Sequence, residues 1–268
     1  AIMVVTAALI VVLSVFNGFE NLVKSLYADF YADIRISAAT GKWFEANEKM
    51  ASLLQSHPAI AQWSAVVEER AILIAGEDKS IVWLKGVLPD YGKVSRVAHH
   101  LVRGQFELGD SNRPALVLGG GVEHDLQIAA GQSLYPVTVF LPNRKAVNTS
   151  DPLEALHSSN VYASGTFSIQ QEFDNQYAFT NVAFMRYMLE LGASDASSIE
   201  IKLKTGQHAK MVARSLQQHL GNAFVIKTRY QQNQSLYVAM QIEKLIIFGV
   251  AFLILLIAAF NIMSTLTM

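Results

Sequence analysis

The last 24 residues, 245–268, carry no charged side chain, and this stretch constrains the fold more than any other feature. As a helix it would be roughly 36 Å long, enough to cross a hydrocarbon core of about 30 Å. The first 16 residues are also free of charge, and all 21 basic and 22 acidic residues lie between the two segments. The alternative, two core helices of a soluble protein, is disfavoured because 24 uncharged residues are long for a buried helix. We predict a truncated membrane helix at 1–16, a second with its outer extension at 236–268, and a domain of mixed polarity between them.

Chemistry-bearing motifs are missing from this sequence. The net charge of −1 and the absence of cysteine point neither to a nucleic-acid surface nor to a disulfide framework. The three glycines at 119–121 lack the spacing of a phosphate loop, and the adjacent Glu123, His124 and Asp125 cannot form a catalytic triad as sequence neighbours. None of the seven histidines has metal-site spacing. We therefore expect no catalytic residue, cofactor or metal, and no enzymatic activity in this chain.

The order of predicted elements indicates an α+β domain with two related halves around an inserted lobe. Apolar residues at helical spacing extend the first helix from residue 16 to Phe30. A hairpin is predicted from strands 63–75 and 80–87 around a turn at 76–79. The remaining predicted strands are 34–37, 115–118, 132–141, 160–170, 177–180, 198–204 and 223–228, and the helices are 43–56, 120–128, 181–191 and 207–219.

Two further segments are informative. Residues 142–159 are polar, contain two prolines, and predict a long loop that serves either as plain surface or as a docking site for a partner. Residues 229–268 contain no proline and one glycine, which predicts a single uninterrupted helix of about 39 residues, roughly 58 Å long. A stiff helix of this kind carries a displacement outward, whereas a flexible linker dissipates it.

Three stretches resemble a known family. Residues 13–20, LSVFNGFE, resemble the end of the first membrane helix in lipoprotein-releasing ABC transporter permeases of the Lol type (LolC and LolE), and Asn17, Gly18, Phe19 and Glu20 are the candidate residues of this motif. Residues 258–262 and 264–266, which include Phe260 and Asn261, resemble the second membrane helix of the same family. Weaker matches of spacing lie at 86–89 and 117–131. The wider class includes MacB-like efflux permeases and FtsX-like division proteins.

The resemblance implies a MacB-like extracytoplasmic domain built from a porter-like part and an inserted sabre lobe. On this plan 17–108 and 192–235 are the two halves of the porter-like part, and 109–191 is the sabre-like insertion. The family's docking hook falls in 142–159, so that Pro142, Asn143, Arg144, Lys145 and Pro152 are the candidate docking residues.

The resemblance also implies an inner-membrane, multi-pass permease with this domain in the periplasm. Its partners would be a cytoplasmic ABC ATPase, a second permease subunit, a periplasmic lipoprotein carrier, lipoprotein cargo and membrane lipids. ATP hydrolysis in the separate ATPase would move the membrane helices, and the outer domain would transmit this motion. MacB-like efflux, FtsX-like mechanotransmission and a membrane-anchored sensor domain are the alternatives.

Overall fold

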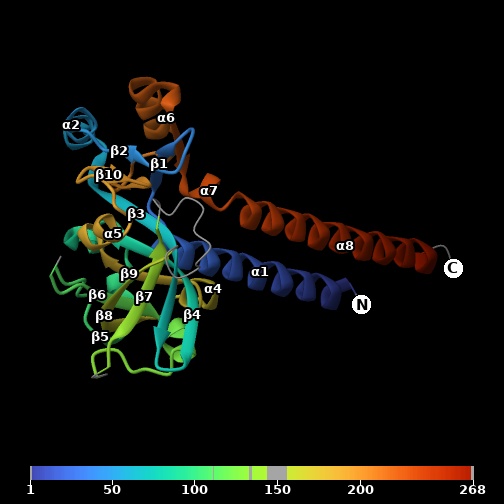
Figure 1. The fold of residues 1–268 in the computed structure, drawn as a ribbon. Coiled ribbons are helices and arrows are strands. Elements are labelled where there is room, and N and C mark those ends of the chain that lie inside the picture. The colour runs from blue at the N-terminus through green and yellow to red at the C-terminus, as the bar shows by residue number, and fades with distance from the viewer. Residues whose placement is uncertain (1, 111, 133–134, 144–155, 267–268) are drawn as a thin grey trace. The chain divides into compact units, whose positions relative to one another are not determined.

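A computed structural model describes residues 2–110, 112–132, 135–143 and 156–266. The chain divides into two compact units, which we call the helical unit (1–27 and 230–268) and the folded domain (28–229). Figure 1 shows the elements of both units.

The helical unit consists mainly of α1 (Ile2–Phe30), whose last residues belong to the folded domain, and α8 (Gln234–Leu266). α1 confirms that the first apolar segment continues as helix well past residue 16. An ion pair between Lys244 Nζ and Glu20 Oε2, 3.5 Å apart, joins α8 to α1. Among the described residues, Gln234–Ile257 is the one stretch long and apolar enough to cross a membrane, with a mean hydropathy of 2.2. The membrane helix at 1–16 stays a prediction.

The prediction of one uninterrupted helix over 229–268 is wrong. The structure has a short helix, α7 (Arg229–Gln232), then a break at Asn233, and then α8. The Asn233 carbonyl accepts a hydrogen bond from the Tyr237 backbone at 3.2 Å, as expected of a residue that starts a new helix. Asparagine favours such positions because its side chain competes for backbone hydrogen bonds, and a search for proline and glycine overlooks it.

The folded domain contains a sheet of ten strands in the order β12-β1-β11-β3-β4-β9-β6-β8-β5, with β7 paired to β3 and β8. Its strands are β1 (Ile34–Ala38), β3 (Ile60–Ala75), β4 (Asp78–Val87), β5 (Leu101–Gly104), β6 (Ala115–Gly119), β7 (Val137–Pro142), β8 (Leu156–Phe167), β9 (Tyr177–Asn181), β11 (Ser198–Leu203) and β12 (Phe224–Thr228). The pairs β4–β9 and β6–β8 are parallel and the others antiparallel. A separate small sheet pairs β2 (Phe44–Glu45) with β10 (Asp195–Ala196).

Helices lie between these strands. They are α2 (Glu48–Ser56), α3 (Gly120–Asp125), α4 (Gln171–Asp174), α5 (Val182–Met188) and α6 (Ala209–Leu220), together with the 3-10 helices η1 (Pro89–Lys93), η2 (Val97–His100) and η3 (Gly221–Ala223). β1-α2-β3 and β11-α6-β12 are two β-α-β units whose strands interleave in the sheet, as in a split β-α-β fold. The predicted order of elements in the two halves is therefore confirmed.

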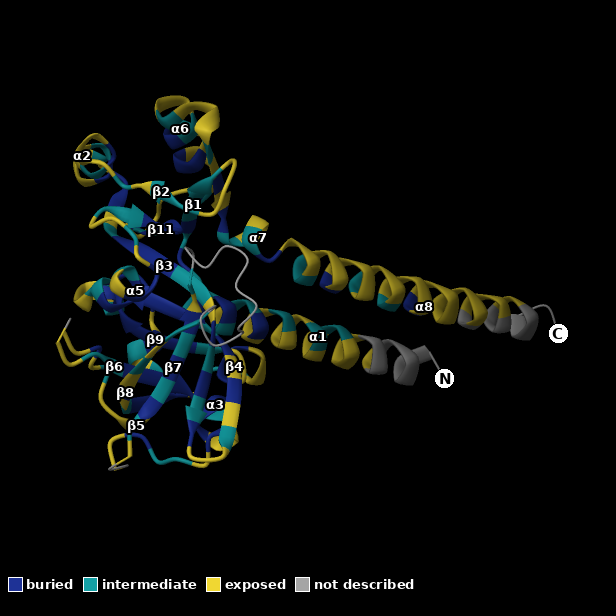
Figure 2. Ribbon diagram, viewed as in Figure 1, coloured by how far each residue is buried: buried dark blue, intermediate teal, exposed yellow. Residues whose placement is uncertain are grey.

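Among the described residues, two hydrophobic clusters lie along this sheet, and β3, which has many buried residues (Figure 2), contributes to both. The first core contains Ile60 of β3 with residues of α2, α6, β1, β11 and β12. The second contains Val67, Ala71, Leu73 and Ala75 of β3 with residues of β4, β6 to β9, α3 and α5. The predicted boundaries between porter-like and sabre-like parts stay a prediction.

Several predicted boundaries need correction. The helix predicted at 43–56 begins only at Glu48, because Asn47 caps it by accepting from the Met50 backbone N–H at 3.0 Å. The hairpin turn is two residues long, since Ala75 pairs with Asp78. The strand predicted at 132–141 begins at Val137.

The predicted loop 142–159 is also too long. β7 includes Pro142, and β8 already begins at Leu156, where Leu156 pairs with Pro142 across the two strands. The four polar side chains at 157–160 misled the prediction, because it is backbone pairing with residues 138–141 of β7, and not an apolar pattern, that keeps these residues in the sheet.

Candidate functional site

The residues predicted from the membrane-helix motifs lie on α1 and α8. Asn17, Gly18, Phe19 and Glu20 are consecutive on α1, and the Phe19 ring is exposed. Glu20 accepts a hydrogen bond from Lys24 in addition to its ion pair with Lys244. Phe260 is an exposed residue of α8, and Asn261 is on the same helix. The sequence did not predict the link between Glu20 and Lys244.

The predicted docking residues are placed only in part. Pro142 is the last residue of β7, and Asn143 follows it directly. Arg144, Lys145 and Pro152 lie outside the described residues. The structure therefore does not test these residues as a group.

The structure identifies instead a junction at the end of α1, where aromatic side chains of the folded domain surround Phe30. The Phe30 side chain is 1% exposed, and its ring stacks on Phe173 with centroids 4.1 Å apart and planes inclined by 3°. The rings of Tyr177 and Phe179 are inclined by 62° to that of Phe30, with centroids 4.7 and 6.1 Å away. The periodicity of the sequence assigned Phe30 to the apolar stripe of a helix, but it could not identify ring partners more than 140 positions away.

Polar contacts fix the same helix end. The last carbonyls of an α-helix lack partners within the helix. Here the Asp29 carbonyl accepts from the Arg96 backbone N–H at 2.9 Å, and the Ser95 hydroxyl donates to the Asp29 and Phe30 carbonyls at 3.1 Å. The Asp29 carboxylate also lies 3.0 Å from His100 Nε2. The end of α1 is thus held by the segment that follows β4.

The last residue of the folded domain, Arg229, is hydrogen-bonded to residues 31–33 near its start. Arg229 Nη2 donates to Asp33 Oδ1 at 2.5 Å, Arg229 Nε donates to the Tyr31 carbonyl at 3.2 Å, and the Arg229 backbone N–H donates to the Asp33 carbonyl at 3.0 Å. Asp33 Oδ2 accepts from the Leu203 backbone N–H at 2.9 Å. We call the bonds between Arg229 and residues 31–33 the clasp.

A buried ionic network lies next to Phe30. Lys85 Nζ donates to Glu200 Oε1 at 2.8 Å and to Tyr91 Oη at 3.0 Å, and the Tyr91 hydroxyl donates to Glu200 Oε2 at 2.6 Å. The side chains of Lys85 and Glu200 are each 3% exposed. Lys85 Nζ also lies 5.5 Å from the Phe30 ring centroid, a cation–π distance. The network therefore joins β4, β11 and η1 to the end of α1.

Electrostatics favour the ionised carboxylate of this network. Burial alone would raise the pKa of Glu200, but the charges of Lys85 and Arg35 outweigh it and hold this pKa below its usual range. Arg35 is directly opposite Glu200 in the pairing of β1 with β11. Burial and the neighbouring Glu200 carboxylate raise the pKa of Tyr91, which stays a neutral donor.

Removing the clasp should destabilise the folded domain. We expect Arg229→Ala to lower its free energy of unfolding by about 1–2 kcal/mol, because a half-buried charged hydrogen-bond network is lost. The stability of Arg229→Lys should fall between those of the native protein and Arg229→Ala, since lysine keeps the charge but not the forked geometry. Denaturant unfolding of the chain in detergent, followed by tryptophan fluorescence, measures this difference. Arg214→Ala, on the exposed side of α6, is the matched control, and an equal loss in both variants would contradict a specific clasp.

Comparison with known proteins places these features in context. The sequence profile of the MacB-like periplasmic core domain matches residues 1–219. The lipoprotein-releasing system transmembrane protein LolC of Xylella fastidiosa is 24% identical over 258 residues, which covers 96% of this chain and 60% of that protein. The lipoprotein-releasing system transmembrane protein LolE of Haemophilus influenzae is 24% identical over 267 residues, covering 98% of this chain and 62% of that protein.

A solved structure shows a similar fold. The crystal structure of the periplasmic region of MacB from Actinobacillus actinomycetemcomitans superimposes with a TM-score of 0.50 and 14% identity. The superposition covers 81% of this chain and 98% of that one.

Proposed function

This chain belongs to the family of MacB-like periplasmic core domains, and from that premise we propose that it is part of an ABC transporter permease of the lipoprotein-releasing type. The predicted α+β class with a MacB-like fold is confirmed by the family match and by the solved MacB structure. The likeness to LolC and LolE over nearly the whole chain supports the lipoprotein-releasing type. The chain spans about 60% of the length of these curated relatives.

We propose the inner membrane as its location, with the folded domain in the periplasm. Its partners would be a cytoplasmic ABC ATPase, a second permease subunit, a periplasmic carrier and lipoprotein cargo, and the chain itself would have no catalytic site. MacB-like efflux or FtsX-like mechanotransmission is the second candidate, and the MacB-like description of the matching family favours the former of these two. Residues 142–159, with Pro142, Asn143, Arg144, Lys145 and Pro152, remain our candidate for carrier docking.

In the mechanism that we propose, the folded domain receives motion of the membrane helices at the junction. The observation that carries this proposal is the fixed end of α1. Phe30 is packed among aromatic rings, the Asp29 and Phe30 carbonyls are bonded to Ser95 and Arg96, and Arg229 is bonded to Asp33. A displacement of the chain at the end of α1 or at Arg229 therefore acts directly on buried contacts of the domain, and no free linker absorbs it.

The break at Asn233 offers the sharpest test. Inserting Gly-Ser-Gly-Ser between Gln232 and Asn233 in the full-length protein should leave the domain folded but reduce lipoprotein export, because the exit helix is uncoupled from the clasp. The amount of lipoprotein retained in the inner membrane measures the effect. The same insertion between Gly76 and Glu77, in the exposed β3–β4 turn, is the control.

Normal export with the insertion after Gln232 would overturn the transmission mechanism while leaving the transport assignment intact. Unchanged lipoprotein localisation after depletion of the whole protein would instead overturn the lipoprotein assignment and favour the efflux or FtsX-like alternative.

A further inference from the structure

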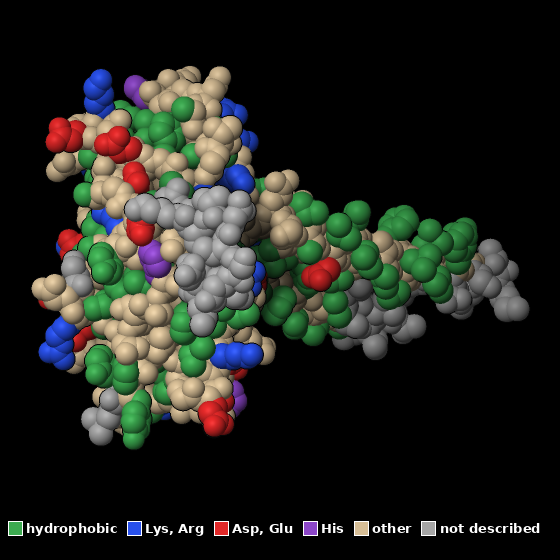
Figure 3. Space-filling model, viewed as in Figure 1, with side chains coloured by type: hydrophobic (Ala, Val, Ile, Leu, Met, Phe, Trp, Pro, Cys, Tyr) green, Lys and Arg blue, Asp and Glu red, His purple; other side chains and the backbone are tan. Residues whose placement is uncertain are grey.

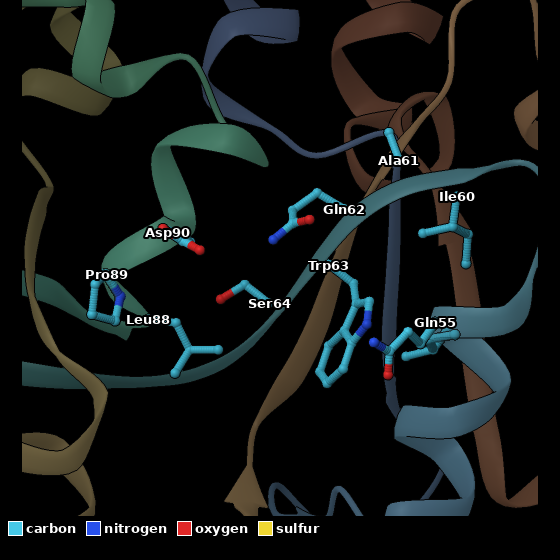
Figure 4. A pocket seen from close by; sticks show the side chains of 10 residues that line it. Gln55, Ile60, Ala61, Gln62, Trp63, Ser64, Leu88, Pro89 and Asp90 are labelled. Atoms are coloured by element: carbon cyan, nitrogen blue, oxygen red, sulfur yellow. The ribbon is translucent and has the colours of Figure 1, made fainter.

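Five consecutive residues of β3, from Ile60 to Ser64, line one cleft of about 540 Å³ (Figure 4). Leu54 and Gln55 of α2 line its one end, and Leu88, Pro89 and Asp90 line the other. Neighbouring residues of a strand point to opposite faces of a sheet. A cleft that contacts five in a row must therefore run along the edge of the strand, next to its backbone.

Among the described residues, no strand pairs with that edge of β3. β11 pairs with β3 from Ile60 to Val66 on one side, and β4 pairs with it on the other side only from Val67 onward. The chain turns away after Val87, where Pro89 begins η1. Within the described part of the chain, no hydrogen bond joins the backbone of residues 61–64 to any segment other than β11. The cleft thus occupies the space that a longer β4 would fill.

The two sides of the cleft differ in chemistry. Figure 4 shows Gln62 and Ser64 on the same side of the β3 ribbon as Asp90, and the Trp63 ring on the opposite side, beside Gln55. Asp90 is the one charged residue of the lining, and its partner is Lys93 in an exposed pair of 3.2 Å. An occupant would therefore meet polar groups and a negative charge on one side and an indole ring on the other.

The walls decide what kind of occupant can enter. The edge of β3 is recessed between α2 and η1. Another strand can therefore reach this edge only if that strand is not flanked by bulky elements of its own protein. The same edge of a second copy carries the same two walls, and the two Asp90 carboxylates would approach each other with like charge. A slender, extended segment of a different protein fits these restrictions.

We propose that this cleft binds an extended segment of a partner protein, added to β3 as an antiparallel or parallel strand. The segment would run along residues 60–64, over roughly 17 Å. Its contacts would centre on Ala61, Gln62 and Trp63, because Ile60 and Ser64 are only 7% and 1% exposed. Strand addition to a free edge supplies main-chain hydrogen bonds, and the flanking side chains supply selectivity. The favoured segment alternates apolar residues, packed on Trp63, with polar ones, and carries Lys or Arg near Asp90. The proposal does not depend on the cargo of the transporter.

The test uses a defined probe, the acetylated, amidated heptapeptide Val-Thr-Val-Lys-Val-Thr-Val, added to the complete chain in detergent. We expect saturable binding and slower amide hydrogen exchange at residues 60–66, read by mass spectrometry. A peptide with alternate backbone nitrogens methylated should bind about tenfold more weakly, because two or three hydrogen bonds are lost.

A charge exchange tests the position of the probe. Asp90→Lys should weaken binding of the lysine peptide by about fivefold and strengthen binding of the same peptide with glutamate in place of lysine. Glu77→Lys, in the exposed β3–β4 turn, is the control and should change neither.

Absence of binding, equal binding of the methylated peptide, or protection outside residues 60–66 would overturn the proposal. Protection that grows with protein concentration in the absence of peptide, together with a dimer mass, would assign the edge to a second copy and overturn it as well.

Discussion

Replacing Phe30 with alanine should lower the free energy of unfolding of the folded domain by about 3–5 kcal/mol, the range for removing a large aromatic side chain from a core. The ring is fully enclosed and stacked on Phe173, so its loss leaves a cavity between elements that are themselves well packed. Phe30→Leu should cost less, since it keeps part of the volume. All three tryptophans lie between residues 43 and 83, and their fluorescence therefore reports unfolding of this domain.

Phe19→Ala is the matched control for this experiment. It removes the same side chain from the same helix, but the Phe19 ring is 57% exposed. It should leave the unfolding midpoint of the domain nearly unchanged. If Phe30→Ala lowers the free energy of unfolding by less than about 1 kcal/mol, the anchoring of α1 is contradicted, because removal of a buried ring of this size has a larger effect.

Breaking the buried ionic network should have an effect of similar size. Lys85→Met should destabilise the domain by about 3–5 kcal/mol, because it leaves the Glu200 carboxylate buried without its cation. The double variant Lys85→Met with Glu200→Leu should recover a large part of this loss, since no unpaired charge then remains. Lys93→Met, at an exposed pair, should have little effect on stability. A double variant no more stable than Lys85→Met would contradict this account.

The network also predicts an acid dependence. The pKa of Glu200 is lower in the folded domain than its ordinary value of 4.5, so the carboxylate stabilises the fold at neutral pH. That contribution is present above the unfolded pKa and is lost as the pH falls through the folded pKa. Stability of the native chain should therefore decline below about pH 4.5 more steeply than that of Glu200→Gln, as measured by denaturant unfolding between pH 3 and 6. Parallel curves for the two proteins would assign the acid dependence to other groups.

Local signals in the sequence predicted much of the fold. The apolar stripe identified α1, alternation and a glycine turn identified the β3–β4 hairpin, and the order of elements identified the two β-α-β units. These features depend on residues close together in the chain. The break at Asn233 escaped because asparagine is a weaker signal than proline or glycine.

The junction could not be predicted, because its partners are remote in sequence. Lys85 and Glu200 are 115 positions apart, and Arg229 and Asp33 are 196 apart. Each of these residues, taken alone, resembles an ordinary surface charge. Only the strand order, which places β11 next to β3 and β3 next to β4, brings Glu200 to Lys85. The unpaired edge of β3 also depends on where a neighbouring strand stops, which no single segment reveals.

The clasp has a consequence for how such a protein can be rebuilt. Because the Arg229 backbone nitrogen lies 3.0 Å from the Asp33 carbonyl oxygen, the folded domain (28–229) begins and ends at adjacent points. Modules with adjacent ends are the ones that tolerate transplantation and circular rearrangement. We therefore expect that the folded domain can be exchanged for that of a relative, provided that Arg229 and Asp33 are transferred together with it.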